Sequence, residues 1–262
     1  MNCKNCNKPL LDTQKYCDEC GAKVIKNRLT PTVLVHQINE EFISIDNKFL
    51  QTFVNLYKNP EDVINRYIDG TRKRYINVLQ YFAIGLTLAG IQFYIMQRFF
   101  PEQFDFSNIF NQEINESNQS FQEKLNEVLG DGGNFQSFAY IISVPFSAIS
   151  TWLTYRFTGF KKFNFTEHVV INLYYSGQII ITTSIFYIIT SVLGIGLIYS
   201  STIISITTFF YQCYVFKKVT NESSLETFAK IVVSYFVIAI QAVILIVLLV
   251  LILVLLKLTN II

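Results

Sequence analysis

Charged residues, histidine and tryptophan are scarce in this sequence. Only 15% of the 262 residues are charged, whereas 51% are hydrophobic, and the chain has two His and one Trp. This composition is too apolar for an ordinary soluble domain and predicts an all-α polytopic membrane protein. The net charge is +2, so the overall balance gives no reason to expect nucleic acid as a partner.

The N-terminal region lacks the apolar segment of a secretory signal peptide. Residues 1–28 are polar and rich in lysine, and the first long apolar run begins at Val78. We therefore expect no cleavable signal peptide, and we expect the first membrane span to act as its own insertion signal.

Five apolar runs are long enough to cross a bilayer, which requires about 20 residues in a helix. The expected spans are Val78–Gln97, Phe135–Tyr155, Val169–Thr190, Leu193–Phe216 and Ile231–Leu256. The third and fourth runs are almost continuous, and Gly194 and Gly196 favour a tight turn between them. The sequence leaves the boundary between these two spans open.

None of the five runs contains Asp, Glu, Lys, Arg or His. Ion-driven transporters usually keep such residues inside their spans, so their absence disfavours that class. The main polar residues are Gln92, Asn172, Gln178, Gln241 and the Ser and Thr residues at positions 200–208. Such residues more often join helices than carry a substrate. Transport or lipid movement along a polar seam formed by them is an alternative function.

Lys and Arg residues gather on one side of the expected spans. They are Arg72, Lys73, Arg74, Arg156, Lys161, Lys162, Lys217, Lys218 and Lys230. The acidic segment at about 98–134 falls on the other side. Because an excess of Lys and Arg marks cytoplasmic loops, we expect a cytoplasmic N-terminus and an external C-terminus. We expect the cluster Arg72, Lys73 and Arg74 to contact anionic lipid headgroups of the cytoplasmic leaflet.

Two C-x-x-C pairs lie at the N-terminus, formed by Cys3, Cys6, Cys17 and Cys20. Each pair can deliver two thiolates to a tetrahedral metal ion, and a reducing cytoplasm disfavours disulfides. Asn7 and Gly21 follow the second cysteine of each pair and tolerate a positive φ, which directs backbone N–H groups towards sulfur. We expect structural Zn²⁺ in a four-cysteine ribbon. A redox dithiol pair and a rubredoxin-like iron site are the alternatives.

Residues 29–77 are expected to form amphipathic helices beside the membrane. The helical pattern is carried by Leu34, Ile38 and Phe42, and after Asp46 by Phe49, Leu50, Phe53, Leu56 and Tyr57. A third helix is predicted with Asn59 as its N-cap, Pro60 at its first position and Gly70 as its stop. These helices lie on the membrane surface or pack against the cytoplasmic ends of the spans, and both arrangements can hold together.

Glu167 and His168 form an ionisable pair at the start of the third expected span. A functional interpretation makes them a proton or metal site, or the active site of a membrane-embedded enzyme. The alternative is that Thr166 and Glu167 begin the helix at the favourable end of its dipole, with His168 at the membrane interface.

Several short motifs occur in order along the chain. They are Lys15-Tyr-Cys-Asp-Glu-Cys-Gly-Ala-Lys23, Thr52-Phe, Leu56, Asn59-Pro60, Val63-Ile64, Tyr67-Ile68, Gly70, Arg72-Lys-Arg-Tyr75 and Phe165-Thr-Glu-His-Val169. Together they resemble the DUF3667 family. The resemblance implies an uncharacterised bacterial protein of the cytoplasmic (inner) membrane, and it transfers no catalytic residue.

We therefore expect three parts: a cytoplasmic zinc ribbon at 1–28, amphipathic helices at 29–77, and a transmembrane bundle at 78–262. A metal site closed by four protein ligands, spans without ionisable residues and the lack of a nucleophile–base pair favour a non-enzymatic role. In that role the head recruits or senses a cytoplasmic protein partner, and the bundle anchors it or transmits a signal.

Overall fold

The structure is a computed structural model of the whole chain, and it describes residues 2–11, 13–24, 30–32, 48–71, 73–104 and 132–258. The chain divides into two compact units, Met1–Asn47 and Lys48–Ile262. We call the first unit the head and the second the helical unit. The helix predicted around Leu34 to Phe42, residue Arg72 and most of the acidic segment (105–131) lie outside the described residues.

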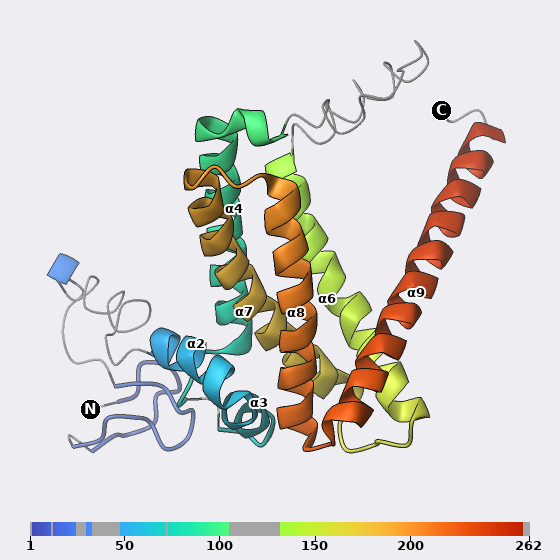
Figure 1. Ribbon diagram of the computed structural model, residues 1–262. Coiled ribbons are helices and arrows are strands. Elements are labelled where there is room, and N and C mark those ends of the chain that lie inside the picture. The colour runs from blue at the N-terminus through green and yellow to red at the C-terminus, as the bar shows by residue number, and fades with distance from the viewer. Residues whose placement is uncertain are drawn as a thin grey trace, which may run out of the picture. The chain divides into compact units, whose positions relative to one another are not determined.

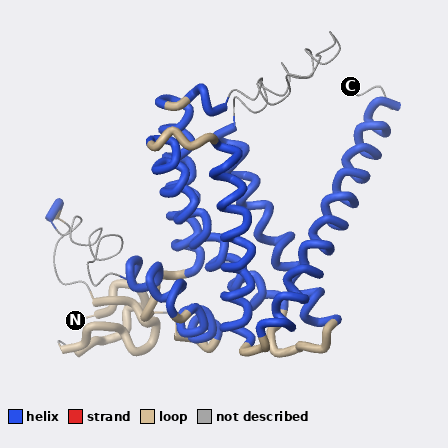
Figure 2. The backbone as a smooth tube through the Cα atoms, in the orientation of Figure 1, coloured by secondary structure: helices blue, strands red, loops and turns tan. Residues whose placement is uncertain are grey.

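The helical unit contains helices and no strand among its described residues (Figures 1 and 2). In chain order they are α2 (Lys48–Lys58), α3 (Pro60–Ile68), α4 (Val78–Phe99), the 3₁₀ helix η2 (Pro101–Phe104), α6 (Gly132–Phe157), α7 (Phe165–Val192), α8 (Leu197–Thr220) and α9 (Ser224–Leu258). The all-α prediction is thereby confirmed for this part of the chain.

The ends of α3 follow the predicted local chemistry. Asn59 occupies the N-cap position and Pro60 the first helical position, where the missing N–H of proline would have no intrahelical partner. After the C-cap, Asp69, Gly70 adopts φ +98 and ends the helix. The turn between α7 and α8 also contains a glycine at positive φ, Gly194. It begins at Leu193, so the fourth expected span starts too early by a few residues.

Helix α7 is the centre of the unit and contacts α2, α3, α4, α6 and α8. Its closest approach is to α4, where two glycines meet. A Cβ atom at Gly85 would lie 3.2 Å from the carbonyl oxygen of Gly177, and a Cβ at Gly177 would lie 3.0 Å from the Tyr81 ring. Gly90, by contrast, has open space beside it. Of the two glycines in the first expected span, Gly85 therefore serves close packing.

Helices α2 and α3 pack against α7 and α8 rather than standing apart from the bundle. The Tyr57 hydroxyl lies 2.5 Å from that of Thr182 on α7. On α8, the Tyr214 hydroxyl donates to the carbonyl of Lys58 at 2.9 Å. The Asn65 side chain of α3 donates to the carbonyl of Val219. Of the two predicted arrangements for this segment, packing against the spans is present in the structure.

Three helices are long and apolar enough to cross a membrane among the described residues: α4, α7 and the part of α9 up to Leu248. The predicted number of five spans is not confirmed. Helices α6 and α8 coincide with the second and fourth expected spans, but both contain many Ser and Thr residues, which lower their hydropathy. In Figure 1, α9 lies beside α6 and α8 at its start and diverges from both towards its C-terminal end.

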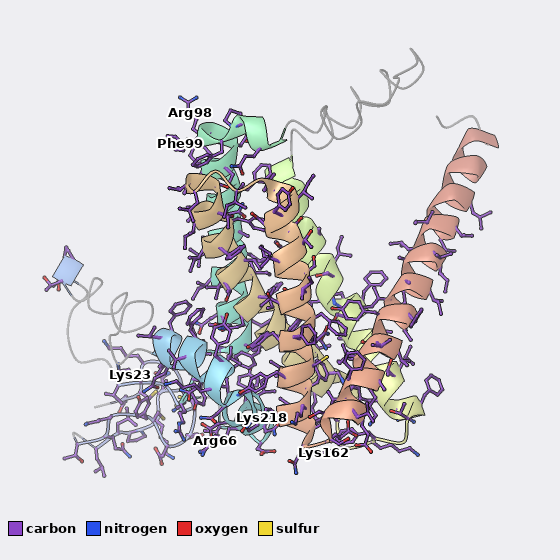
Figure 3. The ribbon with its side chains drawn as sticks, in the orientation of Figure 1. Lys23, Arg66, Arg98, Phe99, Lys162 and Lys218 are labelled. Atoms are coloured by element: carbon purple, nitrogen blue, oxygen red, sulfur yellow. The ribbon has the colours of Figure 1, made fainter. Side chains whose placement is uncertain are left out.

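Basic side chains of the helical unit gather at one end of the bundle. Figure 3 shows Arg66, Lys162 and Lys218 at the end where α8 finishes, and Arg98 at the opposite end. Four ion pairs between described residues occur at the first end: Arg66 and Arg74 with Asp62, Lys218 with Glu61, and Lys230 with Glu222. Lys162 and Lys218, two of the basic residues predicted to lie on one side of the membrane, thus lie at the same end of the bundle.

Candidate metal centre

The four cysteines are held by two turns with the same backbone pattern. In the first, the N–H of Asn7 donates to the carbonyl of Cys3 at 2.8 Å; in the second, the N–H of Gly21 donates to that of Cys17 at 2.9 Å. Asn7 has φ +62 and Gly21 has φ +69, as predicted for the residue after each second cysteine. An isolated antiparallel bridge closes each turn, Asn2 with Pro9 and Tyr16 with Lys23.

The two turns bring the four sulfur atoms into one cage. The Sγ atoms of Cys3 and Cys20 are 3.6 Å apart, as are those of Cys6 and Cys17, and all four lie within 4.8 Å of one another. All four are free thiols. A tetrahedral ion with metal–sulfur bonds of about 2.3 Å requires sulfur–sulfur distances near 3.8 Å. The cage therefore fits one metal ion bound by four protein ligands.

Protonation of the thiols differs across the cage. A hydrogen bond with the Asn5 side chain, followed by one with the backbone of Ala22, lowers the pKa of Cys20 to about 6. For Cys6, a lowering hydrogen bond with the Lys8 backbone is outweighed by the neighbouring sulfurs and by burial, which raise the pKa to about 12. Four adjacent thiolates repel one another, so a bound cation releases protons on binding.

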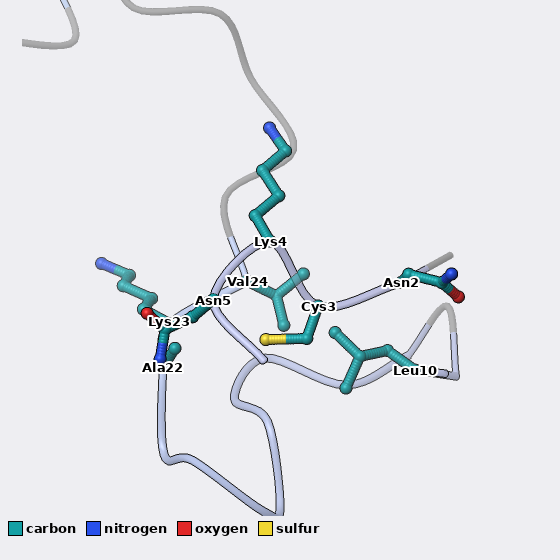
Figure 4. A pocket seen from close by; sticks show the side chains of 8 residues that line it. All are labelled: Asn2, Cys3, Lys4, Asn5, Leu10, Ala22, Lys23 and Val24. Carbon is teal, nitrogen blue, oxygen red and sulfur yellow. The ribbon is translucent and has the colours of Figure 1, made fainter. Parts of the chain in front are cut away.

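One face of the head carries a depression of about 280 Å³ beside this cage. It is lined by Asn2, Cys3, Lys4, Asn5, Leu10, Ala22, Lys23 and Val24. In Figure 4 the side chains of Cys3, Leu10 and Val24 converge, while those of Lys4 and Lys23 extend outwards. Leu10 is 7% exposed, and both lysines are exposed. The depression thus has an apolar floor and a basic rim.

Lys8, another basic residue of the head, forms ion pairs with two carboxylates. Its ammonium lies 3.0 Å from Asp18 and 3.4 Å from Glu19, and the hydrogen bond with Asp18 raises the pKa of Lys8. Asp18 and Glu19 thus both pair with Lys8 within the head.

The depression was not identified from the sequence, although a repeat indicates it. Leu10 follows Cys6 by the same number of residues as Val24 follows Cys20. Each turn therefore presents an apolar side chain at an equivalent place, and the two meet on one face. Reading the two cysteine pairs as a repeat would have found both residues.

The predicted lipid-binding cluster is described only in part, since Arg72 lies outside the described residues. Arg74 lies 3.8 Å from Asp62 and over the ring of Tyr75. The Tyr75 hydroxyl donates to Asp62, and Arg66 pairs with the same carboxylate. Although burial acts in the other direction, these contacts lower the pKa of Asp62. Arg74 is therefore not a fully free cation, which the sequence pattern does not reveal.

The structure places Glu167 and His168 in different surroundings. Glu167 forms a capping box with Asn164: its backbone N–H donates to the Asn164 side chain, and its carboxylate accepts from the Asn164 N–H at 2.7 Å. His168 is 1% exposed, and its Nδ1 lies 3.2 Å from the Thr151 hydroxyl. The two side chains do not form a common site. Glu167 lies in the first turn of α7, in agreement with the alternative interpretation, but the helix begins at Phe165 after the N-cap Asn164, and His168 is buried.

The polar side chains of the expected seam lie in different contacts. Gln178 accepts a hydrogen bond from Tyr81 of α4 and donates to the carbonyl of Phe53 on α2 at 3.2 Å. Asn172 accepts from Ser147 of α6 at 2.6 Å. The amide of Gln241 on α9 has no hydrogen-bond partner among the described residues. Each of the first two amides joins helices at a separate place.

Comparison with known proteins identifies one part of the chain. No curated protein and no solved structure matches the chain. A family model matches the part that runs from the start of α2 through the first half of α4. This part includes α2 and α3, which pack against α7 and α8, and it excludes the four cysteines. Residues 46–90 match the family model described as "Protein of unknown function (DUF3667)", which confirms the predicted resemblance over this segment.

Proposed function

We propose that this protein is a multi-pass protein of the bacterial cytoplasmic membrane whose zinc-binding head recruits or senses a cytoplasmic protein partner. The depression beside the metal cage carries the proposal. A cage closed by four thiolates stabilises a fold and leaves no open coordination position for a substrate. The adjoining surface, with an apolar floor and two lysines at its rim, has the character of a contact site for another protein.

Zinc is the ion we propose for the cage. Tetrahedral four-thiolate sites are typical of Zn²⁺ and of iron–sulfur centres. Among its described residues the head buries one hydrophobic side chain, Leu10, besides two of its cysteines, and a module of this size commonly depends on a metal for its fold. A structural role of zinc explains both features without a redox step.

The membrane arrangement we propose keeps five spans, with α6 and α8 beside α4, α7 and α9. Both helices are longer than the roughly 20 residues that a bilayer requires, and the hydroxyls of their Ser and Thr residues bond to carbonyls one turn earlier, as in Thr202 to Ile198 and Thr151 to Ser147. Hydroxyls bonded in this way are tolerated in lipid. The basic end of the bundle is then cytoplasmic.

The test is affinity purification of the full chain from its membrane with the cage intact and disrupted. We expect the variant Cys3→Ser/Cys6→Ser to lose stoichiometric zinc and a defined set of cytoplasmic partners together. The matched control is Cys213→Ser, which removes a partly buried thiol of α8 and should keep both. A second variant, Lys4→Glu/Lys23→Glu, changes the rim of the depression without touching a ligand.

Loss of the partners in the lysine variant with zinc retained would support the depression as the contact site. If both variants keep the same partners, or if zinc is absent from the wild-type protein, the proposal is wrong. Orientation is tested separately by protease treatment of right-side-out vesicles, in which a cytoplasmic head must stay protected.

A further inference from the structure

The C-terminal end of α6, the loop after it and the start of α7 carry aromatic and basic side chains that the proposed function leaves unexplained. We call this group the aromatic–basic corner; it consists of Trp152, Arg156, Phe157, Lys161, Lys162 and Phe165. Trp152, Arg156 and Phe157 lie in the last two turns of α6, Lys161 and Lys162 lie in the loop that follows, and Phe165 is the first residue of α7. The corner therefore lies where two proposed spans leave the membrane on the basic end of the bundle.

The aromatic members of the corner form a small exposed surface. Phe157 is 83% exposed and Phe165 is 40% exposed. The rings of Trp152 and Phe165 contact each other edge to face, with centroids 5.9 Å apart. Tryptophan at the end of a span is typical of the membrane interface, where its ring places an apolar body in lipid and a polar N–H in water, and the two Phe rings add exposed apolar surface beside it.

Two of the three cations of the corner, Arg156 and Lys162, lie over aromatic rings. The guanidinium carbon of Arg156 is 5.6 Å from the centre of the Trp152 ring, and the ammonium of Lys162 is 4.9 Å from that of Phe163. Arg156, Lys161 and Lys162 are all exposed, and none of them forms an ion pair with a described carboxylate. An aromatic ring carries no net charge, so a cation that lies over it stays positively charged and can still attract an anion.

The other cations at this end of the bundle include several that are already neutralised. Arg66 and Arg74 pair with Asp62, Lys218 pairs with Glu61, and Lys230 pairs with Glu222. The nearest acidic side chain along the corner, Glu167, accepts the N–H of Asn164 in its capping box. Positive charge without a carboxylate partner is thus concentrated beside an exposed aromatic surface.

From this juxtaposition we propose that the aromatic–basic corner is a binding site for the headgroup of an anionic phospholipid. The phosphate lies against Arg156, Lys161 and Lys162, and Trp152, Phe157 and Phe165 contact the glycerol region and the first part of the acyl chains. The proposal rests on the membrane-spanning arrangement proposed above and adds a lipid class and a site, which differs from the predicted cluster at residues 72–74.

The chain offers its own reporter, because Trp152 is its single tryptophan. The full-length protein is reconstituted in vesicles, and its Trp fluorescence is measured with brominated phosphatidylglycerol or brominated phosphatidylcholine at equal mole fraction. We expect stronger quenching by the anionic lipid. Lys161→Gln/Lys162→Gln should reduce this preference by about fivefold for each lysine at low ionic strength, which corresponds to about 1 kcal/mol per cation near the membrane surface.

A matched control separates a site from general surface charge. Lys58→Gln/Lys217→Gln removes two exposed lysines that form no ion pair with described residues, and neither lysine lies in the corner. We expect it to leave the lipid preference of Trp152 unchanged. Equal quenching by the two lipids in the wild type, or an equal loss of preference in the control, would overturn the proposed site.

A second reporter distinguishes failure of the site from failure of the membrane arrangement. In Trp152→Phe/Ile244→Trp the tryptophan lies on α9, where Ile244 is 54% exposed, and we expect quenching by both brominated lipids without a headgroup preference. If this reporter is quenched while Trp152 is not, the corner faces another partner, such as an acidic protein segment, and only the lipid site is wrong. If neither is quenched, the membrane-spanning proposal is wrong as well.

Discussion

The described part of the head has Cys3, Leu10 and Cys17 as its buried hydrophobic side chains, whereas the helical unit buries a continuous cluster that includes Tyr81 and Phe216. A fold with so little apolar burial depends on the ligand that joins its turns. The helical unit depends instead on close approach of helices and on hydrogen bonds between them. The stability of the head therefore depends on a bound metal ion, whereas the stability of the helical unit depends on helix packing. We expect either one to change without the other.

The largest effect is expected from removing one ligand of the cage. Cys17→Ser should abolish metal binding, whose apparent free energy in structural zinc modules is about 10–16 kcal/mol, and should leave the head open to proteolysis. The melting temperature of the helical unit should not change. Metal content, limited proteolysis and thermal unfolding of the same sample check this. A lower melting temperature of the helical unit would show that the two units are not independent.

Close packing of α4 on α7 provides the converse test. Gly85→Leu places a side chain against the carbonyl of Gly177, and overpacking of this kind costs about 1–3 kcal/mol. We expect thermal unfolding of the helical unit in detergent at lower temperature, with metal content unchanged. Gly90→Leu, in the same helix but with open space beside it, is the control and should unfold like the wild type. Equal destabilisation by the two variants would contradict the assignment.

A smaller effect is expected from the amide of Gln178. Gln178→Leu leaves the Tyr81 hydroxyl and the Phe53 carbonyl without their partner, at a cost of about 1–2 kcal/mol. Gln92→Leu is the matched control, because the Gln92 amide donates to Met96 of its own helix and forms no hydrogen bond with another helix among the described residues. A double-mutant cycle with Tyr81→Phe isolates the pair. No coupling between the two changes would show that the hydrogen bond does not stabilise the fold.

The carboxylate of Asp62 gives the helical unit a pH dependence. Since its pKa is lowered in the folded state, its contribution is present above the ordinary carboxyl pKa of about 3.9 and is lost as the pH falls through the lower folded value. Asp62→Asn should cost about 0.5–1 kcal/mol at pH 7, and the difference from wild type should narrow at pH 3. Asp69→Asn, at the exposed C-cap of α3, should show neither effect.

The smallest effect is expected on α9. In the most apolar stretch of α7, 61% of the residues are buried, whereas in that of α9 only 11% are buried. Ile244→Ala on the exposed face should change stability by less than about 0.5 kcal/mol. Ile231→Ala, at a fully buried position of the same helix, should cost about 2–4 kcal/mol. Similar losses for both would show that α9 is covered by protein over its whole length.

Local chemistry made parts of this structure predictable. The cysteine spacing, the positive φ of Asn7 and Gly21, and the limits of α3 each depend on a few neighbouring residues. The number of membrane spans was harder to predict from the sequence. Hydropathy alone does not distinguish a Ser- and Thr-rich span from a helix that packs inside a bundle without crossing the membrane. Hydropathy also does not predict burial by protein: α9 is the most apolar of the three candidate spans and the least buried.

Contacts between distant residues could not be predicted. The apolar face of α2 was recognised from its helical period, but a periodic pattern does not say whether lipid or protein covers that face. The partners of α2 and α3, such as Thr182 and Val219, lie far along the chain. Likewise, the adjacency of Glu167 and His168 in sequence says little, because neighbouring residues on a helix point in directions about 100° apart.

The packing of α2 and α3 has a consequence for synthesis. Tyr57 leaves the ribosome 125 residues before Thr182, and Lys58 precedes Tyr214 by 156 residues. At about 5–20 residues per second, translation separates these partners by roughly 6–30 s. The segment that matches the family model is therefore synthesised early, but it can pack against α7 and α8 only after those helices have been synthesised. During that interval the side of α2 and α3 that faces α7 and α8 lacks its native partners, so the bilayer surface or a chaperone must cover that side while the later helices insert.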